Sequence, residues 1–598
     1  MKLIKTLCIL FTSLTLFSQN FVEKKLPKPD NLSSLFIGPL LKSTIHYGAK
    51  PDNFNGKVIL FNHGYIDLNQ LFFTNNTFYQ EAYNEGYQVV FVATTRGEGM
   101  WANGKLLAES IDTITNKYHV NDVYIIAHSN GGKASEVAMY THKKYNKVKK
   151  VFALGTPYWG TYLADISQQW WLNWLWKKTG LNEGGATSTT YYCRDVVRPY
   201  FDNHVNNEPS KFIILGGSGF ARGHTLLAPL MFASGSVLYL HQGVNDGVSS
   251  YKSTLRPNGI YTFKKNEAYL DHVDIALGQY VWKHIKPYLD ESALKKTTTK
   301  NNSELINYTK TTSDYQIINS ENDYDKIIAD KGNTNIDLQI FHENSYSDFN
   351  LKSTKGSLLP QRRKYSKTNS VADYVSNYTL KTSNSSVLKG NSKFVAYAHQ
   401  SNGPKMVYEV KKDKNILKVS FLNSNVNFND IEVTATITKT SDLLGNTTEE
   451  EIYLQSFNYH QKTKNFTLDT SFFKEGVYTI YINSKHLDFT RNIISGFTVG
   501  TITNTKIKEL NAPKEFLFDI KLSNTIITNS INIKTKGISP THKLSIKVYT
   551  INGQLITDAI MIGNNGIYST NTNNLSSGLY IATIAYKNHS KSFKIIKK

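Results

Sequence analysis

The stretch Ala127-His128-Ser129-Asn130-Gly131-Gly132 follows the apolar run 123–126 and precedes a segment typical of a helix. This order predicts a strand, a sharp turn and a helix, with Ser129 at the apex of the turn. A serine hydroxyl becomes an effective nucleophile when a strained turn holds it clear of its neighbours and beside a base. Small residues two before and two after the serine permit such a turn. The segment favours nucleophilic catalysis, although a serine that caps an ordinary helix has the same pattern.

The surrounding residues alternate between apolar strands and amphipathic helices. This alternation predicts an α/β fold with a mostly parallel central sheet, covered by helices on both faces and carrying its sites at the carboxyl ends of the strands. The predicted strands are Lys57–Asn62, Gln88–Thr94, Asp122–His128, Val148–Gly155 and Lys211–Gly217, and the predicted helices are Asn103–Tyr118, Gly131–Tyr145 and His272–Tyr288.

Two later segments offer the partners that a nucleophilic serine needs. Asp246 lies in the turn Asn245–Ser249, where its carboxylate could orient an imidazole. His272 precedes the last predicted helix of the α/β region and is the candidate base. His128 is a poorer candidate, because strand alternation should point its ring away from the site. We therefore predict that Ser129, Asp246 and His272 meet in that chain order.

The segment Phe61-Asn62-His63-Gly64-Tyr65 closes the first strong strand. A backbone N–H just after such a His-Gly pair faces the nucleophile in hydrolases of this architecture. We expect the backbone N–H groups of Tyr65 and Asn130 to form the oxyanion hole. A simple strand-to-loop turn would leave the same residues at this position.

Together these residues resemble the bacterial true lipases of the α/β-hydrolase superfamily. The resemblance covers somewhat under half of the chain and implies hydrolysis of lipid or other carboxylic esters at an interface, with no cofactor required. Alanine stands where the usual motif has its first glycine. The strings that carry the resemblance are 62–64 (NHG), 127–132 (AHSNGG), 154–160 (LGTPYWG), 245–249 (NDGVS) and 271–274 (DHVD).

The resemblance also raises the question of a calcium ion. Lipases of this family often bind calcium through an aspartate two residues after the catalytic histidine, and Asp274 occupies that position. His224 and Thr225 fall where a second aspartate ligand would be expected. Calcium normally needs several oxygen ligands, so Asp274 alone does not decide whether the protein binds calcium.

Four tryptophans lie within seven residues, beside Leu172 and Leu175. A helix through this segment would be apolar around most of its circumference, so it cannot rest in water by itself. Its position after Gly160 is where lipases carry a lid, which would pack over the active site and open onto lipid. The alternative is an ordinary buried helix. The four residues are Trp170, Trp171, Trp174 and Trp176.

The composition limits which binding partners and which cellular compartment we expect. The formal net charge is +21 over 598 residues, but the lysines are scattered and no nucleic-acid motif accompanies them, so we expect no nucleic-acid partner. Lys2, Lys5 and the apolar stretch 7–17 predict a secretory signal at 1–19. No later segment is long and apolar enough to predict a transmembrane anchor. Two cysteines leave no scope for a disulfide framework.

The sequence changes character after Leu289. Residues 20–290 form the predicted catalytic domain, and 291–390 are rich in polar residues and are predicted to be a low-complexity linker. Alternating segments predict a β-sandwich-like domain over 391–500. The final strings 552–554 (NGQ) and 575–581 (LSSGLYI) resemble the C-terminal sorting domain of the type IX secretion system, which we place at 508–598. This resemblance implies contact with that machinery and a secreted or cell-surface location.

Two other functions remain open at this stage. An esterase or a polyester depolymerase would use the same triad with a different pocket. A surface-binding protein could carry a non-catalytic hydrolase core, with an adhesive β-sandwich at its C-terminus.

Overall fold

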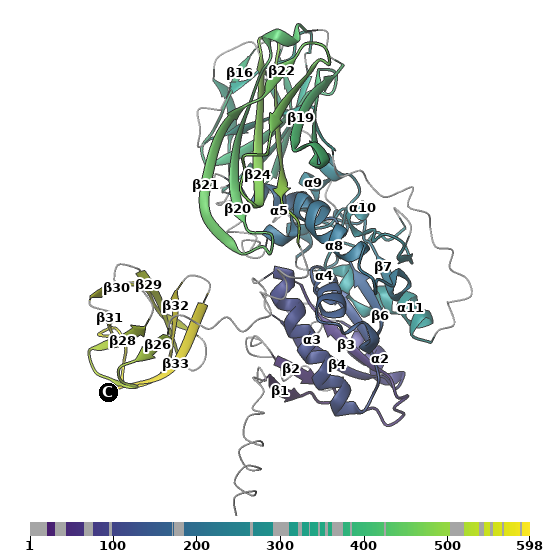
Figure 1. Cartoon of the computed structure of the whole chain (residues 1–598), viewed down its shortest axis with the longest axis vertical. Helices are drawn as coiled ribbons and strands as arrows, with labels where there is room; N and C mark the ends of the chain where they lie inside the picture. Colours follow the sequence, from purple (N-terminus) through teal and green to yellow (C-terminus); the bar gives the residue numbers. More distant parts are fainter. Residues whose placement is uncertain are drawn as a thin grey trace, which may run out of the picture. The chain divides into compact units, whose positions relative to one another are not determined.

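The computed structural model contains a central eight-stranded sheet in the order β1-β2-β4-β3-β5-β6-β7-β8 (Figure 1). All neighbouring strands are parallel except β2 and β4, which are antiparallel. The fold class predicted for this region is confirmed. The strands are β1 (Val22–Lys25), β2 (Thr44–Tyr47), β3 (Val58–Asn62), β4 (Gln88–Ala93), β5 (Val123–His128), β6 (Val148–Leu154), β7 (Phe212–Leu215) and β8 (Ile260–Tyr261).

The structure describes most of the chain, with gaps between the described ranges. These ranges are 21–29, 44–64, 76–94, 99–169, 172, 185–225, 227–263, 267–290, 310–320, 326–333, 335–344, 347–352, 357–360, 375–382, 385–423, 426–502, 519–536, 543–550, 554–564, 567–586 and 589–598. The predicted signal segment 1–19 lies outside them.

The inner strands of the central sheet, such as β3 and β4, are buried at every position, so both faces of the sheet are covered there. In β3, Val58 and Leu60 belong to one hydrophobic cluster, and Ile59 and Phe61 belong to another. Alternate side chains of a strand point to opposite faces, so the sheet needs helices on both sides. The first cluster includes residues of α3 (Gly99–Tyr118), and the second includes residues of α2 (Phe78–Asn84) and α11 (Gly278–Leu289).

Two predicted helices differ from the observed ones in their ends. The helix after Ser129 is α4 (Gly131–Glu136), which continues as a π-helical turn to Thr141. The predicted helix 272–288 is a short 3₁₀ turn followed by α11. The remaining helices of this part are α5 (Tyr162–Ser167), α7 (Thr190–Tyr192), α8 (Arg198–Asp202), α9 (Ala228–Gln242) and α10 (Tyr251–Thr254).

The prediction of a low-complexity linker at 291–390 is wrong for the part that the structure describes. Eight strands lie between 310 and 390, and β9 pairs with β18 beyond the predicted boundary. Polar side chains dominate these strands, but their few apolar residues gather in one cluster, as Ile336, Leu338 and Ile340 do. The strands are β9 (Lys310–Ser313), β10 (Tyr315–Asn319), β11 (Lys326–Ile327), β12 (Asn335–His342), β13 (Phe349–Lys352), β14 (Ser357–Pro360), β15 (Val375–Lys381) and β16 (Ser386–Gly390).

Residues 310–499 form four sheets, which we call the β region. Their orders are β10-β17-β12-β15-β14, β11-β16-β13, β22-β23-β19-β18-β9 and β21-β20-β24-β25. The later strands are β17 (Phe394–His399), β18 (Lys405–Lys411), β19 (Ile416–Leu422), β20 (Glu432–Ser441), β21 (Thr447–Ser456), β22 (Asn458–His460), β23 (Asn465–Asp469), β24 (Gly476–His486) and β25 (Phe489–Val499).

The β region and the α/β part form one compact unit that extends to Ile502. Leu443 and Val477 of the β region belong to the same buried cluster as helix α3. The Tyr192 hydroxyl donates to the Leu443 carbonyl over 2.9 Å. The β region therefore completes the hydrophobic core of the α/β part.

The second unit, residues 503–598, is all β. Its strands assemble in the order β26-β28-β31-β30-β29-β32-β33-β27 around a core that includes Ile546 and Ile584. The strands are β26 (Asp519–Leu522), β27 (Ile526–Ile527), β28 (Ser530–Lys536), β29 (Lys543–Thr550), β30 (Leu555–Asn564), β31 (Ile567–Asn571), β32 (Gly578–Tyr586) and β33 (His589–Lys597).

Candidate active site

Ser129 stands between the end of β5 and the start of α4. Its φ angle is +54°, a left-handed conformation that L-residues other than glycine, asparagine and aspartate rarely adopt. The turn is held by a hydrogen bond from the Ser129 N–H to the Leu154 carbonyl at 2.9 Å and from the Gly132 N–H to the Ser129 carbonyl at 3.1 Å. Such a strained turn at a strand-to-helix junction suits an exposed nucleophile, because it lifts the side chain above the sheet.

Asp246 and His272 are brought together, as a carboxylate that orients an imidazole should be. Asp246 Oδ2 lies 2.8 Å from His272 Nδ1, and the His272 N–H donates to the Asp246 carbonyl over 2.7 Å. The other carboxylate oxygen accepts the N–H groups of Val248 and Ser249. Both residues are buried. The carboxylate fixes the tautomer in which Nδ1 carries a proton, so Nε2 is free to accept one.

Gly155 links this pair to the strand edge that carries Ser129. A Cβ atom at Gly155 would lie 2.9 Å from Asp246 Oδ2 and 3.0 Å from His272 Nδ1. Leu154, its neighbour, is the residue that accepts the Ser129 N–H. The three predicted residues therefore lie at one edge of the sheet. Among the described contacts there is no hydrogen bond between Ser129 Oγ and the His272 ring.

The predicted oxyanion hole is described in part. A Cβ at Gly64 would lie 2.7 Å from Ser129 Cβ and 2.9 Å from the Asn130 nitrogen, so this backbone lies directly against the nucleophile turn. Asn130 is the N-cap of α4, and its backbone N–H is on the same turn. Tyr65 lies outside the described residues.

The prediction that His128 points away from the site is wrong. Its ring centroid lies 4.6 Å from that of His272, and its Nε2 lies 2.7 Å from the His272 carbonyl oxygen. Because a carbonyl oxygen only accepts, Nε2 of His128 carries the proton. Full burial lowers the pKa of His128 well below its ordinary value, and the nearby His272 lowers it further, so the ring stays neutral. His128 thus anchors the loop that carries His272.

The calcium ion implied by the lipase resemblance stays a prediction, and one carboxylate oxygen of Asp274 and one of Asp271 are buried without a hydrogen-bond partner in the part of the chain that the structure describes. Asp274 Oδ2 already accepts the backbone N–H of His224 at 3.0 Å and lies 2.7 Å from its Nδ1. The described residues contain no group of three histidine, cysteine or acidic side chains arranged for a metal. Burial and the neighbouring charge of Asp274 raise the pKa of Asp271 to about 7.

The predicted lid tryptophans Trp170, Trp171, Trp174 and Trp176 lie outside the described residues. Two described neighbours contact the β region. Gln169 Nε2 donates to Thr479 Oγ1 over 2.8 Å, and Leu172 is buried in a cluster that includes Ile494. The N-terminal flank of the tryptophan segment is therefore fixed between the α/β part and the β region.

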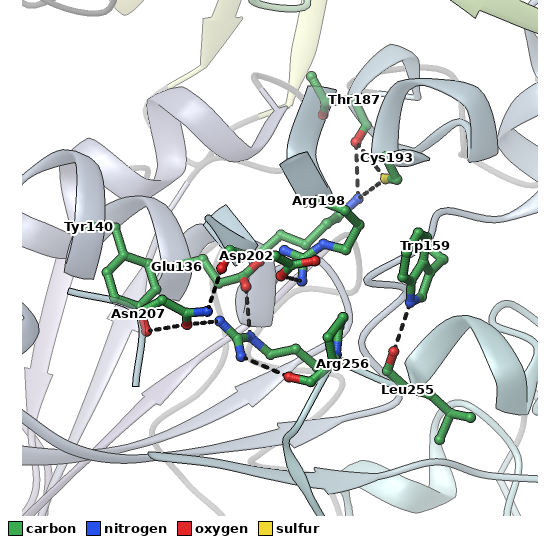
Figure 2. A network of polar contacts seen from close by, with 12 residues as sticks. Glu136, Tyr140, Trp159, Thr187, Cys193, Arg198, Asp202, Asn207, Leu255 and Arg256 are labelled. Atoms are coloured by element: carbon green, nitrogen blue, oxygen red, sulfur yellow. Dashed lines mark hydrogen bonds and ion pairs between the residues drawn. The ribbon is translucent and has the colours of Figure 1, made fainter. Parts of the chain in front are cut away.

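One feature of the site was not predicted from the sequence, a buried ionic network at the far end of α4 (Figure 2). Glu136 accepts from Arg198 Nη2 at 2.5 Å and from Arg256 Nε at 2.8 Å. Arg198 also pairs with Asp202, and Arg256 donates to Asn207. Glu136, Arg198 and Arg256 are fully buried or nearly so. The network joins the helix after Ser129 to the segment after the Asp246 turn, a contact between residues too distant in sequence to form a local motif.

Comparison with solved structures finds similar proteins. The chain is similar to the lipase BlEst2 of Bacillus licheniformis in its propeptide form, at 21% identity over 77% of this chain and 98% of that chain, with a TM-score of 0.52. It is also similar to the mature form of that lipase, at 26% identity over 42% and 99%, with a TM-score of 0.38. The metagenomic carboxyl esterase MGS0156 matches at 12% identity over 46% and 93%, with a TM-score of 0.30.

A family model identifies the end of the chain. Residues 527–598 match the secretion system C-terminal sorting domain, a shorter span than the predicted 508–598. The search of curated proteins found no match. None of the described helices is long and apolar enough to cross a bilayer. The chain thus joins an α/β-hydrolase fold to a C-terminal sorting domain, which indicates export by the type IX secretion system to the cell surface or the medium.

Proposed function

We propose that this protein is a secreted carboxylic ester hydrolase, a lipase that cleaves acylglycerol esters through a serine, histidine and aspartate triad. One observation carries the proposal. The Asp246–His272 pair, joined over 2.8 Å, lies against Gly155 at the strand edge where Ser129 is held at a φ of +54°. Acyl transfer needs a general base whose tautomer is fixed and a serine on a strained turn, and these two features at one edge of the sheet support the proposal.

In the first half of the reaction, Ser129 Oγ attacks the ester carbonyl carbon while His272 Nε2 takes the hydroxyl proton. The carbonyl oxygen becomes an oxyanion, which the backbone N–H groups of Asn130 and Tyr65 would stabilise. The tetrahedral intermediate then collapses. The bond to the alcohol breaks, His272 gives its proton to the leaving oxygen, and an acyl-serine ester remains.

The second half repeats these steps with water. His272 takes a proton from water, the hydroxide attacks the acyl carbon, and collapse returns the proton to Ser129 and releases the acid. Asp246 stabilises the imidazolium that forms in each half. Substrate binding would bring Ser129 Oγ and His272 into hydrogen-bond contact, since catalytic hydrogen bonds often tighten only in the complex.

The first test is covalent labelling. A fluorescent organophosphonate should label the full-length protein at Ser129, and Ser129→Ala should remove the label and lower kcat by at least about a thousandfold without changing the thermal unfolding temperature. Ser167→Ala is the matched control, because the Ser167 hydroxyl donates to the Ala164 carbonyl within α5 and accepts from the adjacent Gln168 side chain. If the wild-type protein is not labelled and hydrolyses no ester, the proposed hydrolase function is wrong, and a surface-binding protein becomes the favoured alternative.

The second test separates a lipase from an esterase or a polyester depolymerase. We propose that the tryptophan segment is a lid that opens onto lipid. Rates on p-nitrophenyl esters of rising chain length should increase toward long chains, and emulsified triglyceride should be preferred over dissolved ester. Serine at all four tryptophan positions should remove that preference. Equal rates on dissolved and emulsified substrate in the wild type would favour an esterase.

We also propose that the β region acts as a pro-domain. The similar lipase BlEst2 is described in a propeptide form, and the match to it extends well beyond the α/β part of this chain. Three contacts support the proposal. Thr479 holds Gln169, Gly496 accepts from Arg194, and Lys412 donates to the carbonyl of Asp195. These contacts hold both flanks of the tryptophan segment, so the β region would restrict its movement.

The pro-domain proposal predicts a difference between large and small substrates. Thr479→Val removes the hydroxyl that holds Gln169 and should raise the rate on emulsified triglyceride while leaving p-nitrophenyl acetate unchanged. Thr467→Val is the control, because Thr467 hydrogen-bonds only the exposed His460. Cleavage at a protease site inserted between 291 and 309 should raise the same rate further. Unchanged triglyceride hydrolysis after cleavage and separation would refute the pro-domain.

A further inference from the structure

Lys133 is an unusual residue to find four positions after the nucleophile turn. Its side chain is fully buried on α4, and no salt bridge among the described residues involves it. Its Nζ atom donates to the Thr187 carbonyl at 3.0 Å and to Ser188 Oγ at 3.1 Å, and it lies 3.8 Å from Cys193 Sγ. Burial lowers the pKa of Lys133. Burying an amine in this way is costly unless its hydrogen bonds are all used.

The Ser188 hydroxyl links Lys133 to Asn130 through two hydrogen bonds. Because Lys133 donates to Ser188 Oγ, the hydroxyl proton of Ser188 remains available, and it points to Asn130 Oδ1 at 3.1 Å. The chain of donors therefore runs in one direction, from the lysine through the serine to the asparagine carboxamide. Donors aligned in this way polarise one another in a buried site.

The turn that holds Ser188 is itself fixed on both sides. The Ser188 carbonyl accepts the Thr161 N–H at 2.9 Å, and Thr187 and Cys193 both contact Lys133 Nζ. Ser188 and Thr187 are buried. The Asn130 side chain is therefore held by a rigid partner and not by a surface group.

We infer that Lys133 and Ser188 are positioning residues that hold Asn130 in the geometry needed for its backbone N–H to stabilise the oxyanion. The inference rests on the proposed ester hydrolysis. Asn130 begins α4 directly after Ser129, so a rotation of its backbone would turn the N–H away from the developing charge. A displacement of about 1 Å at such a donor lowers the rate by about a hundredfold.

The alternative is that Lys133 only fills and bridges the space between α4 and the turn at 186–188. A bridging role would affect the number of folded molecules, whereas a positioning role affects the turnover of each folded molecule. Normalising kcat to the number of phosphonate-labelled serines separates the two. KM should stay constant, because the oxyanion forms only in the transition state.

The experiment uses the full-length protein and four single variants, one of which is a control. Ser188→Ala and Lys133→Met should each lower kcat per labelled serine at least about tenfold, with KM unchanged within about twofold. Ser188→Thr, which keeps the hydroxyl, should recover most of the loss. Cys193→Ala is the matched control, because Cys193 contacts the same Nζ atom but not Asn130, and it should leave both constants unchanged.

A double-mutant cycle tests the connection directly. If Ser188 acts through the Asn130 side chain, Asn130→Ala combined with Ser188→Ala should lose no more activity than the worse single variant. Additive losses, or an unchanged kcat per labelled serine in Ser188→Ala, would overturn the inference even if Lys133→Met fails to fold. A wild-type protein without esterase activity would instead refute the proposed function, so the two failures are distinguishable.

Discussion

The His128 ring holds the backbone of the catalytic histidine candidate, with Nε2 2.7 Å from the His272 carbonyl oxygen. His128 is adjacent to Ser129 in sequence, so one hydrogen bond connects the nucleophile strand to the loop of the base. The ring is buried and neutral, so it adds no second positive charge beside the imidazolium that the proposed mechanism would form on His272.

This contact predicts different outcomes for two substitutions. His128→Leu removes the donor and should lower kcat by about ten- to a hundredfold, because the His272 loop loses its anchor. His128→Gln places an amide N–H near the position of Nε2 and should retain most of the activity. Steady-state kinetics and the acid limb of the pH–rate profile check both. Full activity in His128→Leu would show that the loop needs no such anchor.

Gly155 provides a test of how closely the site is packed. Gly155→Ala would place a Cβ within about 3 Å of both Asp246 and His272, at a φ of +59°. We expect a loss of kcat of about a hundredfold or more. Gly56→Ala is the control, because Gly56 has a φ of +81° and open space around it. Both variants should lose about 1–2 kcal/mol of stability, but only Gly155→Ala should lose activity. Equal activity in the Gly155→Ala and Gly56→Ala variants would mean that Asp246 and His272 can shift to accommodate the added methyl group.

The buried carboxyl of Asp271 predicts a dependence of stability on pH. Its pKa is raised to about 7, whereas an aspartate in the unfolded chain titrates near 3.9. The folded state therefore favours the protonated form, and this contribution to stability is complete below about pH 4 and is lost as the pH rises through about 7. Asp271→Asn should flatten the fall in unfolding temperature between pH 4 and 8.

The control for this measurement is Asp52→Asn, whose side chain is 93% exposed. It should leave the pH dependence as it is in the wild type. A slope in Asp271→Asn identical to the wild-type slope would contradict the raised pKa.

The Glu136 network predicts a large loss of stability from a single substitution. Glu136→Gln would leave Arg198 and Arg256 buried without their shared negative charge, and the free energy of unfolding should fall by about 3–5 kcal/mol. Glu208→Gln is the control, because the Glu208 side chain is 58% exposed and its pair with Lys211 should contribute less than about 1 kcal/mol. Urea unfolding measures both. Similar midpoints for the two variants would mean that the network is not required for stability.

The sequence patterns were sufficient for the sheet and for the chain order of the candidate residues. Strand β5 is a nearly continuous apolar run up to Ala127, and such a run indicates a buried parallel strand without any knowledge of its neighbours. Asp246 and His272 could be chosen because they occupy a glycine-flanked turn and the start of the last helical segment of the α/β part. Their contact in the structure agrees with that choice of residues.

Other features depend on partners that no local pattern specifies. The strand Val375–Lys381 is half polar and becomes a strand because β12 and β14 pair with it on either side. Lys133 has an ordinary position in a helix. Its proposed role depends on the hydrogen bond to Ser188, which lies 55 residues later in the sequence. His128 is still paired within β5, and alternation puts its ring on the same face of the sheet as Ile126. Val273, the neighbour of His272, packs on that face, so the ring of His128 meets the ring of His272.

The shared core of the first unit has a consequence for how the chain folds during synthesis. Leu443 and Val477 complete the cluster that covers helix α3, yet they leave the ribosome long after that helix. Until the strands of the β region have been synthesised, the apolar surface of α3 is either exposed to solvent or covered by another protein. A newly made α/β part is thus a partner-dependent intermediate, and its dependence on chaperones should end when β24 and β25 are in place.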